Sequence, residues 1–214
     1  GLVPDGRTLL DAGISEPSST LAQARRTKVF WALVGSIAVL NCLGTAYLFH
    51  HVDLMASGGV SGEAAAGMFV AYGLVNWIAN LGAGVGVDHL GPRKVLMMGL
   101  GLFTLLTVGL PFVHTSAGVI SYGVAFGVAQ GIQSNVGGSA FAYYFGRDHI
   151  GAIKGFTHTL FVAATAIGPP LLPLVAGWLG GYAPALWVLA LAPLVAALCV
   201  WMWVPRETGA PSTG

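Results

Sequence analysis

Six long apolar runs alternate with short polar segments along this chain of 214 residues. The runs cover residues 29–50, 67–87, 95–113, 117–145, 150–179 and 184–204. A helix needs about 20 residues to span about 30 Å of hydrocarbon, so each run is long enough to cross a bilayer. The fourth and fifth runs are longer than this, and we expect them to be tilted, broken or extended beyond the bilayer. The pattern predicts an all-α membrane protein, a six-transmembrane-helix bundle.

The composition indicates that lipid is the main solvent of this chain. The sequence is 55% hydrophobic and 8% charged, whereas a soluble domain carries about 25% charged residues. Its net charge of +1 is too small for the basic surface that nucleic acid requires, so we expect no nucleic-acid partner. Cys42 and Cys199 both lie inside apolar runs, which favours packing over a disulfide or a metal pair. We therefore expect the lipid bilayer as a partner, with no metal and no cofactor.

The polar ends of the chain flank the predicted bundle. Residues 1–28 form an extended polar segment in which Thr20 and Gln23 have the spacing of a capping box. This spacing predicts a short helix at the membrane surface. We divide the chain into this segment, a bundle at 29–204 and a tail at 205–214. Because the chain begins with a polar segment and Gly1, we interpret it as a piece of a longer protein that starts in a loop.

All nine cations fall on one side of the predicted topology. They are Arg7, Arg25, Arg26, Lys28, Arg93, Lys94, Arg147, Lys154 and Arg206. The three loops on the other side carry Asp53 and Glu63 instead. The positive-inside rule therefore predicts that both termini are cytoplasmic. The same distribution supports six spans, because one span more or fewer would place cations on both sides.

Polar side chains gather at mid-membrane depth, counted at about 1.5 Å per helical residue. The candidates for a substrate path are Asn41, Asn76, Asn80, Gln130, Gln133, Asn135, Lys154 and His158. An unpaired polar group in hydrocarbon costs several kcal/mol, so these groups should face protein or water. Two interpretations stay open, interhelical hydrogen bonds and a hydrophilic path. His158 is the strongest candidate because it is ionisable and deep in a span, whereas Lys154 lies near enough to the interface to snorkel.

Small residues and prolines indicate how the helices meet. Gly123, Gly127 and Gly131 recur at every fourth position, which favours close helix packing, with a sliding contact as the alternative. The Gly-Pro-Pro sequence at 168–170 should weaken the fifth span, either as a passive kink or as the broken helix of a transporter.

A histidine pair lies at the outer end of the first span. His50, His51 and Asp53 could suggest a metal site, but adjacent histidines point apart on a helix, so we favour a solvated loop entrance. No nucleophile elbow, HExxH or phosphate loop is present in the sequence, and we predict that the chain is not an enzyme.

The turn at 84–94 carries the most specific motif. Its pattern Gly84-x-x-x-Asp88-x-x-Gly91-x-Arg93-Lys94 resembles the signature loop of the major facilitator superfamily, which joins its second and third helices and recurs between the eighth and ninth. Residues 20–31 are similar to the start of the seventh helix in monocarboxylate and oxalate/formate carriers. Residues 145–155 are similar to the loop between the tenth and eleventh helices of bacterial members. The resemblance covers nearly the whole chain as a C-terminal half.

The resemblance implies a secondary active transporter of alternating-access type. It would move a small organic solute such as a monocarboxylate, with proton coupling, in a bacterial inner membrane. The partner would be an N-terminal six-helix half of the same protein or a second copy, completing a twelve-helix fold. The cytoplasmic gate motif implied by the family comprises Gly84, Asp88, Gly91, Arg93, Lys94 and Arg147. The alternative for this turn is a charged segment that only fixes topology.

Two departures from the family pattern bear on the cargo. Pro92 stands where the motif usually has Arg, which shifts the cations by one position. Asn80 stands four residues before the first motif glycine, where monocarboxylate-type carriers often have an Arg that holds the carboxylate. An anionic solute would then need Lys154, His158 or the other half to supply the cation. A non-transporting scaffold or receptor of the same fold, and a membrane enzyme using His158 and a serine, are the alternative functions.

Overall fold

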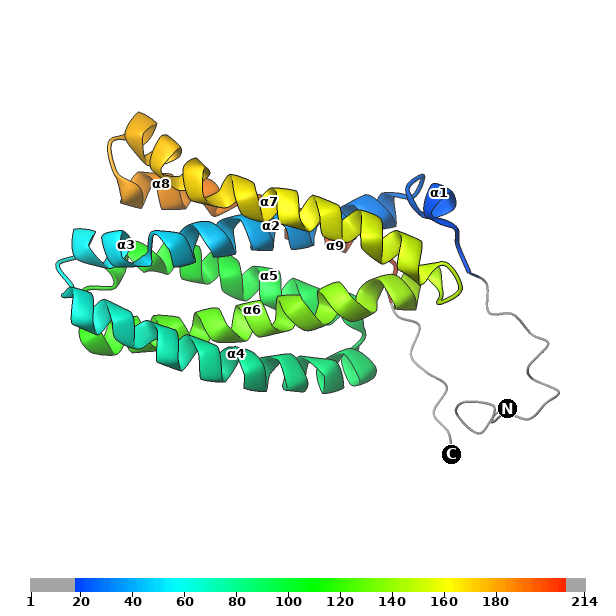
Figure 1. Cartoon of the computed structure of the whole chain (residues 1–214), viewed down its shortest axis with the longest axis horizontal. Helices are drawn as coiled ribbons and strands as arrows, with labels where there is room; N and C mark the ends of the chain where they lie inside the picture. Colours follow the sequence, from blue (N-terminus) through cyan, green and yellow to red (C-terminus); the bar gives the residue numbers. More distant parts are fainter. Residues whose placement is uncertain (1–17, 207–214) are drawn as a thin grey trace.

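The computed structural model describes residues 18–206, and within that range it consists of helices and short turns with no strand. The helices are α1 (Leu21–Ala24), α2 (Lys28–Phe49), α3 (His51–Ser57), α4 (Gly62–Leu90), α5 (Pro92–Gly109), the 3-10 helix η3 (Leu110–Phe112), α6 (Ser116–Phe145), α7 (Ile150–Leu179), α8 (Tyr182–Leu189) and α9 (Leu191–Trp203). The long helices lie side by side along the length of the molecule (Figure 1). The prediction of an all-α fold is confirmed for the described residues.

Each apolar run corresponds to a helix or a pair of helices. The helix of the second run, α4, begins at Gly62, five residues before that run. The reason is that the Ser61 side chain accepts a hydrogen bond from the Ala64 backbone N–H and caps the helix. The sixth apolar run forms two helices, α8 and α9, which are separated at Ala190. Pro193 explains this division, since it has no N–H to donate to the carbonyl of Leu189. The α7 helix, in contrast, continues through its internal prolines.

Five helical segments are long and apolar enough to cross a membrane. They are Lys28–Phe49, Gly62–Leu90, Pro92–Phe112, Ile150–Leu179 and Tyr182–Trp203. The exception among the six predicted spans is α6, which has 30 residues and no charged side chain but is too polar on average. It packs against α4 and α5 and also contacts α2 and α7. Its polar and glycine positions therefore meet other helices, and the count of six spans stays a prediction.

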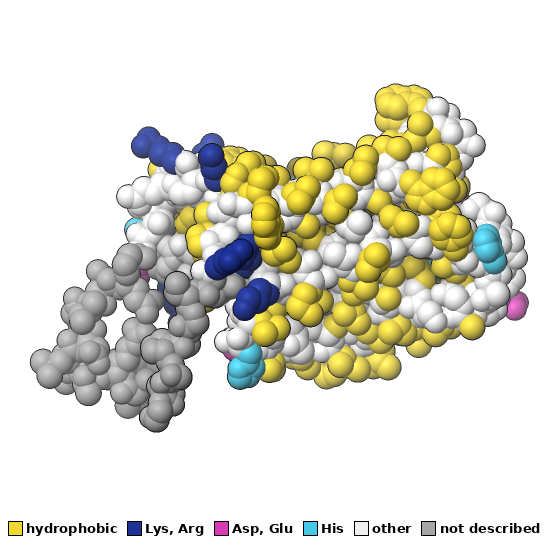
Figure 2. All heavy atoms as spheres, turned by 180° about the vertical axis from the view of Figure 1, so that it is seen from behind, with side chains coloured by type: hydrophobic (Ala, Val, Ile, Leu, Met, Phe, Trp, Pro, Cys, Tyr) yellow, Lys and Arg dark blue, Asp and Glu magenta, His cyan; other side chains and the backbone are white. Residues whose placement is uncertain are grey.

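The described lysine and arginine residues gather at one end of the bundle, which we call the cationic end (Figure 2). They lie in or beside α1, the α4–α5 turn, the α6–α7 turn and the end of α9. Two turns at this end use glycine in a backbone conformation that side chains disfavour, with φ of 83° at Gly91 and 78° at Gly146. Arg7 lies outside the described residues. Which side of the membrane this end faces stays a prediction.

The short helix α1 is attached to the cationic end. The predicted capping box is confirmed, because Thr20 and Gln23 bond each other's backbone amides. The backbone N–H of Ser19 donates to the carbonyl of Phe145 at 2.8 Å. The indole of Trp31 donates to the carbonyl of Arg25 at 2.8 Å. These bonds fix the α1 segment against the start of α2 and the end of α6.

Glycines bring helix backbones into direct contact in the core. A Cβ atom at Gly131 of α6 would lie 2.7 Å from the Asn76 carbonyl oxygen of α4, and one at Gly127 would lie 2.9 Å from that of Tyr72. The predicted close packing of the glycine series is thus confirmed. A second close approach joins α7 to α2, where a Cβ at Gly168 would collide with the carbonyl oxygen of Cys42.

Candidate functional site

A polar groove lies between α2, α6 and α7, and we call it the central groove. Its volume is about 670 Å³. The polar side chains that line it include Asn41, Gln133, Ser134, Lys154, Thr157 and His158. The apolar part of its wall is formed by Ile37, Phe161 and Val162, among others. The groove can therefore receive a small molecule with one polar end and a hydrocarbon part.

Four of the predicted path residues meet in the central groove. The Gln133 amide nitrogen of α6 donates to the Asn41 side-chain oxygen of α2 at 3.1 Å. Lys154 and His158 are four residues apart on α7, so they share one face of that helix. The groove thus combines two amides with an ammonium and an imidazole. These groups can hold an anion by charge-assisted hydrogen bonds.

The other predicted asparagines lie in the contact between α4 and α6. The Asn80 side chain donates to the Gly131 carbonyl at 3.4 Å, and the Asn135 side chain donates to the Asn80 carbonyl at 3.2 Å. The backbone of Asn76 meets Gly127 and Gly131. None of these three lines the central groove. The bonds of Asn80 and Asn135 are of the interhelical kind that the sequence left open as one alternative.

Gln130 has a third environment, in the core between helices. Its side chain fills the space opposite Gly44 of α2, where an added Cβ would lie 2.6 Å from its amide nitrogen. It is buried, and its carbonyl oxygen has no hydrogen-bond partner among the described residues. Gln130 does not line the central groove, although Gln133, three residues later, does.

Ser134 and Thr157 line the groove but were not among the candidate residues. Ser134 could have been found from its position next to Gln133. Thr157 is buried, and its hydroxyl donates to the Lys154 carbonyl at 3.2 Å, so its polarity is satisfied within α7.

A second cavity of about 600 Å³ lies at the cationic end between α4, α6 and α7. It is lined by Asp88, Ser139, Tyr143, Arg147 and Lys154, among others. Lys154 lines both cavities, so the two adjoin at its side chain. Among residues 18–206 the Asp88 carboxylate forms no ion pair, with Arg147 or with another cation.

The residues of the 84–94 motif have separate positions. The Arg93 guanidinium is 6% exposed and donates to the Trp201 carbonyl at 2.8 Å, which ties the start of α5 to the end of α9. Lys94 is exposed, and Gly91 makes the turn. Gly84 lies beside Asn135, whose amide nitrogen would be 3.2 Å from an added Cβ. Of the predicted gate residues, Asp88 and Arg147 share a cavity and Arg93 anchors helices.

A family model for the Major Facilitator Superfamily matches residues 29–214. The chain belongs to this superfamily. The match includes every long helix and both cavities, and it confirms the resemblance of the 84–94 turn at the level of the superfamily. A comparison with curated proteins finds no match. Together with the five apolar helices, this membership identifies an integral membrane protein of a transporter family.

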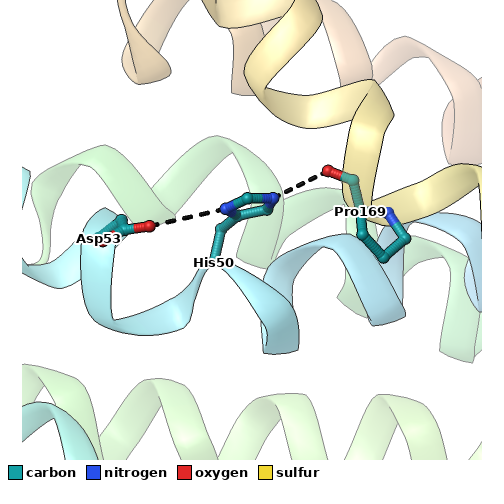
Figure 3. A network of polar contacts seen from close by, with 3 residues as sticks. All are labelled: His50, Asp53 and Pro169. Atoms are coloured by element: carbon teal, nitrogen blue, oxygen red, sulfur yellow. Dashed lines mark hydrogen bonds and ion pairs between the residues drawn. The ribbon is translucent and has the colours of Figure 1, made fainter.

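At the opposite end of this major facilitator bundle, His50 lies between Asp53 of α3 and Pro169 of α7 (Figure 3). A ring nitrogen of His50, Nε2, lies 2.8 Å from the Pro169 carbonyl oxygen, and Nδ1 lies 3.6 Å from the Asp53 carboxylate. In a regular helix that carbonyl would accept from residue 173, but Pro173 has no N–H. His50 therefore supplies the donor that α7 lacks.

The predicted solvated entrance is wrong for His51. This side chain is 1% exposed, and its Nε2 lies 2.9 Å from the Ala65 carbonyl oxygen of α4. The reason is that α3 continues as a helix after α2 and turns His51 toward α4, while His50 turns toward α7. The two side chains diverge, and no group of three metal-ligating side chains occurs among residues 18–206.

Proposed function

We propose that this chain is the C-terminal half of a secondary active transporter that moves a small monocarboxylate by alternating access. The observation that carries the proposal is the central groove, in which Lys154 and His158 face the Asn41–Gln133 amide pair. A carboxylate would be held by the Lys154 ammonium and the amides, with its hydrocarbon part against Phe161 and Val162. Lys154 thus replaces the cation that Asn80 does not provide.

The exposure of the helices beside the groove supports a missing second bundle. Only 11% of the apolar window of α4 and of α7 is buried, compared with 56% for α2. Both helices line the cavity at the cationic end, and α7 also lines the central groove. We propose that an N-terminal six-helix half, or a second copy, covers these faces, and that α6 is the sixth span of this half.

The orientation and the gate complete the proposal. We place the cationic end in the cytoplasm of a bacterium, since cations favour that side of the inner membrane. Asp88 and Arg147 line a cavity at this end without an ion pair, and in the proposed cycle they approach when the cytoplasmic side closes. His158 is the group that would carry a coupled proton, because it is the ionisable imidazole that lines the central groove.

The test is uptake by proteoliposomes that contain the full-length gene product to which this chain belongs. Labelled short-chain monocarboxylates and neutral amides of the same size are supplied under an imposed pH gradient. A hydrogen bond to a charged group contributes about 1.5–3 kcal/mol, so Lys154→Gln should raise KM for the carboxylate by about 10-fold to 150-fold. His158→Ala should abolish the response to the pH gradient while the protein still inserts.

Arg26→Gln is the matched control, because it removes an exposed cation that does not line the groove. It should transport normally. An unchanged KM for Lys154→Gln would contradict the carboxylate site. A full-length protein that binds but never moves any solute would support the scaffold or receptor alternative instead.

A further inference from the structure

A second groove lies on the other face of α2, between this helix and the α8–α9 pair. We call it the lateral groove. Its volume is about 540 Å³. It is lined by Trp31, Gly35 and Val39 of α2 and by Val188, Val195 and Trp203 of the pair, among others. At 100° per residue, Gly35 and Val39 point away from the Asn41 face, so the lateral groove is separate from the central groove.

The wall of the lateral groove is hydrocarbon. The Ser36 hydroxyl is buried and donates to the Ala32 carbonyl at 2.7 Å, and the Trp31 indole donates to the Arg25 carbonyl. Both polar groups therefore have partners within the protein. Gly35 leaves the floor open, because a Cβ atom added there would meet nothing within 4 Å.

The shape of the groove fits an extended chain. Val188 and Trp203 are 15 residues apart, which is about 22 Å along a helix. The volume divided by this length gives a cross-section of about 25 Å² for the centre of a water molecule in the groove, so the walls are about 8–9 Å apart. A helix with its side chains is about 10 Å across and does not fit. An acyl chain does.

The mouth of the groove carries positive charge. Trp31 and Trp203 lie at the cationic end, at the depth where indoles meet lipid headgroups. The Lys28 ammonium lies 5.9 Å from the centre of the Trp203 ring. It is exposed and has no ion-pair partner in the part of the chain that the structure describes. Arg25, whose carbonyl holds Trp31, instead turns its guanidinium over the Phe156 ring of α7, 4.6 Å from the ring centre, so Lys28 is the cation beside Trp203.

We propose that the lateral groove binds one acyl chain of an anionic phospholipid, whose phosphate lies against Lys28. Apolar contact alone would not select this lipid, because bilayer hydrocarbon is as apolar as the groove. The groove orders one acyl chain, and the Lys28 ammonium selects the headgroup. Each cation near an anionic headgroup contributes about fivefold in affinity. The proposal does not depend on the identity of the transported solute.

Native mass spectrometry of the 214-residue chain, released from detergent micelles, tests this site. The micelles are titrated with phosphatidylglycerol or with phosphatidylcholine of the same acyl composition. Wild type should retain one phosphatidylglycerol about fivefold more strongly than phosphatidylcholine. Lys28→Gln should lose about fivefold for phosphatidylglycerol and nothing for phosphatidylcholine.

Gly35→Leu fills the channel and should abolish the single tight adduct of either lipid. Gly101→Leu is the matched control, because Gly101 is an exposed glycine of α5 with nothing within 4 Å of an added Cβ, and it should bind as wild type does. Ala192→Leu narrows the groove from the α9 side and should also lose the adduct. It is a second, independent variant in case Gly35→Leu does not fold.

Two results would overturn the proposal. If wild type bound both lipids equally and Gly35→Leu retained them, the groove would hold only ordinary boundary lipid. If Gly35→Leu converted a dimeric mass into a monomeric one without changing lipid retention, a second protein chain would occupy the groove. A loss of lipid adducts with normal transport would leave the proposed transport function intact.

Discussion

Replacing Gly131 by Ala adds one methyl group where α4 and α6 are closest. The new Cβ would lie 2.7 Å from the backbone carbonyl oxygen of Asn76. It would lie 2.8 Å from both the backbone nitrogen of Asn80 and the Cβ of Ala79. Carbon atoms in contact are normally about 3.5–4.0 Å apart. Because these atoms belong to the backbone or are fixed to it, no rotamer change relieves the overlap. The two helices must separate by nearly 1 Å.

This separation affects the whole interface between α4 and α6. A gap of about 0.5–1 Å forfeits a quarter to a half of each dispersion contact. It also lengthens the bonds from Asn80 to the Gly131 carbonyl and from Asn135 to the Asn80 carbonyl, which are 3.4 and 3.2 Å long. Overpacked cores lose about 1–3 kcal/mol. We expect Gly131→Ala to lie at the upper end, with a loss of about 2–3 kcal/mol in the free energy of unfolding.

Unfolding in mixed micelles titrated with sodium dodecyl sulfate, followed by circular dichroism, measures this loss. Gly138→Ala is the control in the same helix, since an added Cβ there meets nothing within 4 Å. It should be neutral or stabilising by up to about 1 kcal/mol, because Ala favours helix over Gly. Equal stability of the two variants would refute the backbone contact between α4 and α6.

Three further predictions concern the ends of the bundle. His50→Ala leaves the Pro169 carbonyl without a donor and should lower the free energy of unfolding by about 1–3 kcal/mol. His50→Gln keeps a donor and should lose less. Equal losses in the two variants would contradict the role of this hydrogen bond. Burial lowers the pKa of His51, with the hydrogen bond to Ala65 opposing this in part. The unfolded state therefore binds the proton more readily, so stability should be full above about pH 6.5 and fall as the pH drops below it. His51→Gln should reduce the dependence of the unfolding free energy on pH, measured in unfolding curves between about pH 5 and 8. An unchanged pH dependence would show that other groups cause it. Asp88→Asn should slow proteoliposome uptake with near-normal solute binding, and normal turnover would remove Asp88 from the gate.

The helices were predictable because their causes are local. Apolar runs of membrane length, with glycine and capping residues at their ends, correspond to the observed elements. The early start of α4 was missed, because the cap at Ser61 precedes residues that are not strongly apolar. A proline break was predicted for α7, but α7 continues through its three prolines and the break appears before Pro193. In α7, His50 supplies the donor that Pro173 lacks.

The sequence by itself determined the helical membrane fold, the superfamily and the gathering of the cations at one end. It also determined the position of each polar residue along its helix, because this position follows from counting residues. Rotation about the helix axis does not follow from counting, because these helices are apolar on nearly every face. Only the tertiary structure could place Gln133 beside Asn41, 92 residues away, and Asn135 in the α4 contact. The two residues share one helix, and its packing decides which of them lines the central groove.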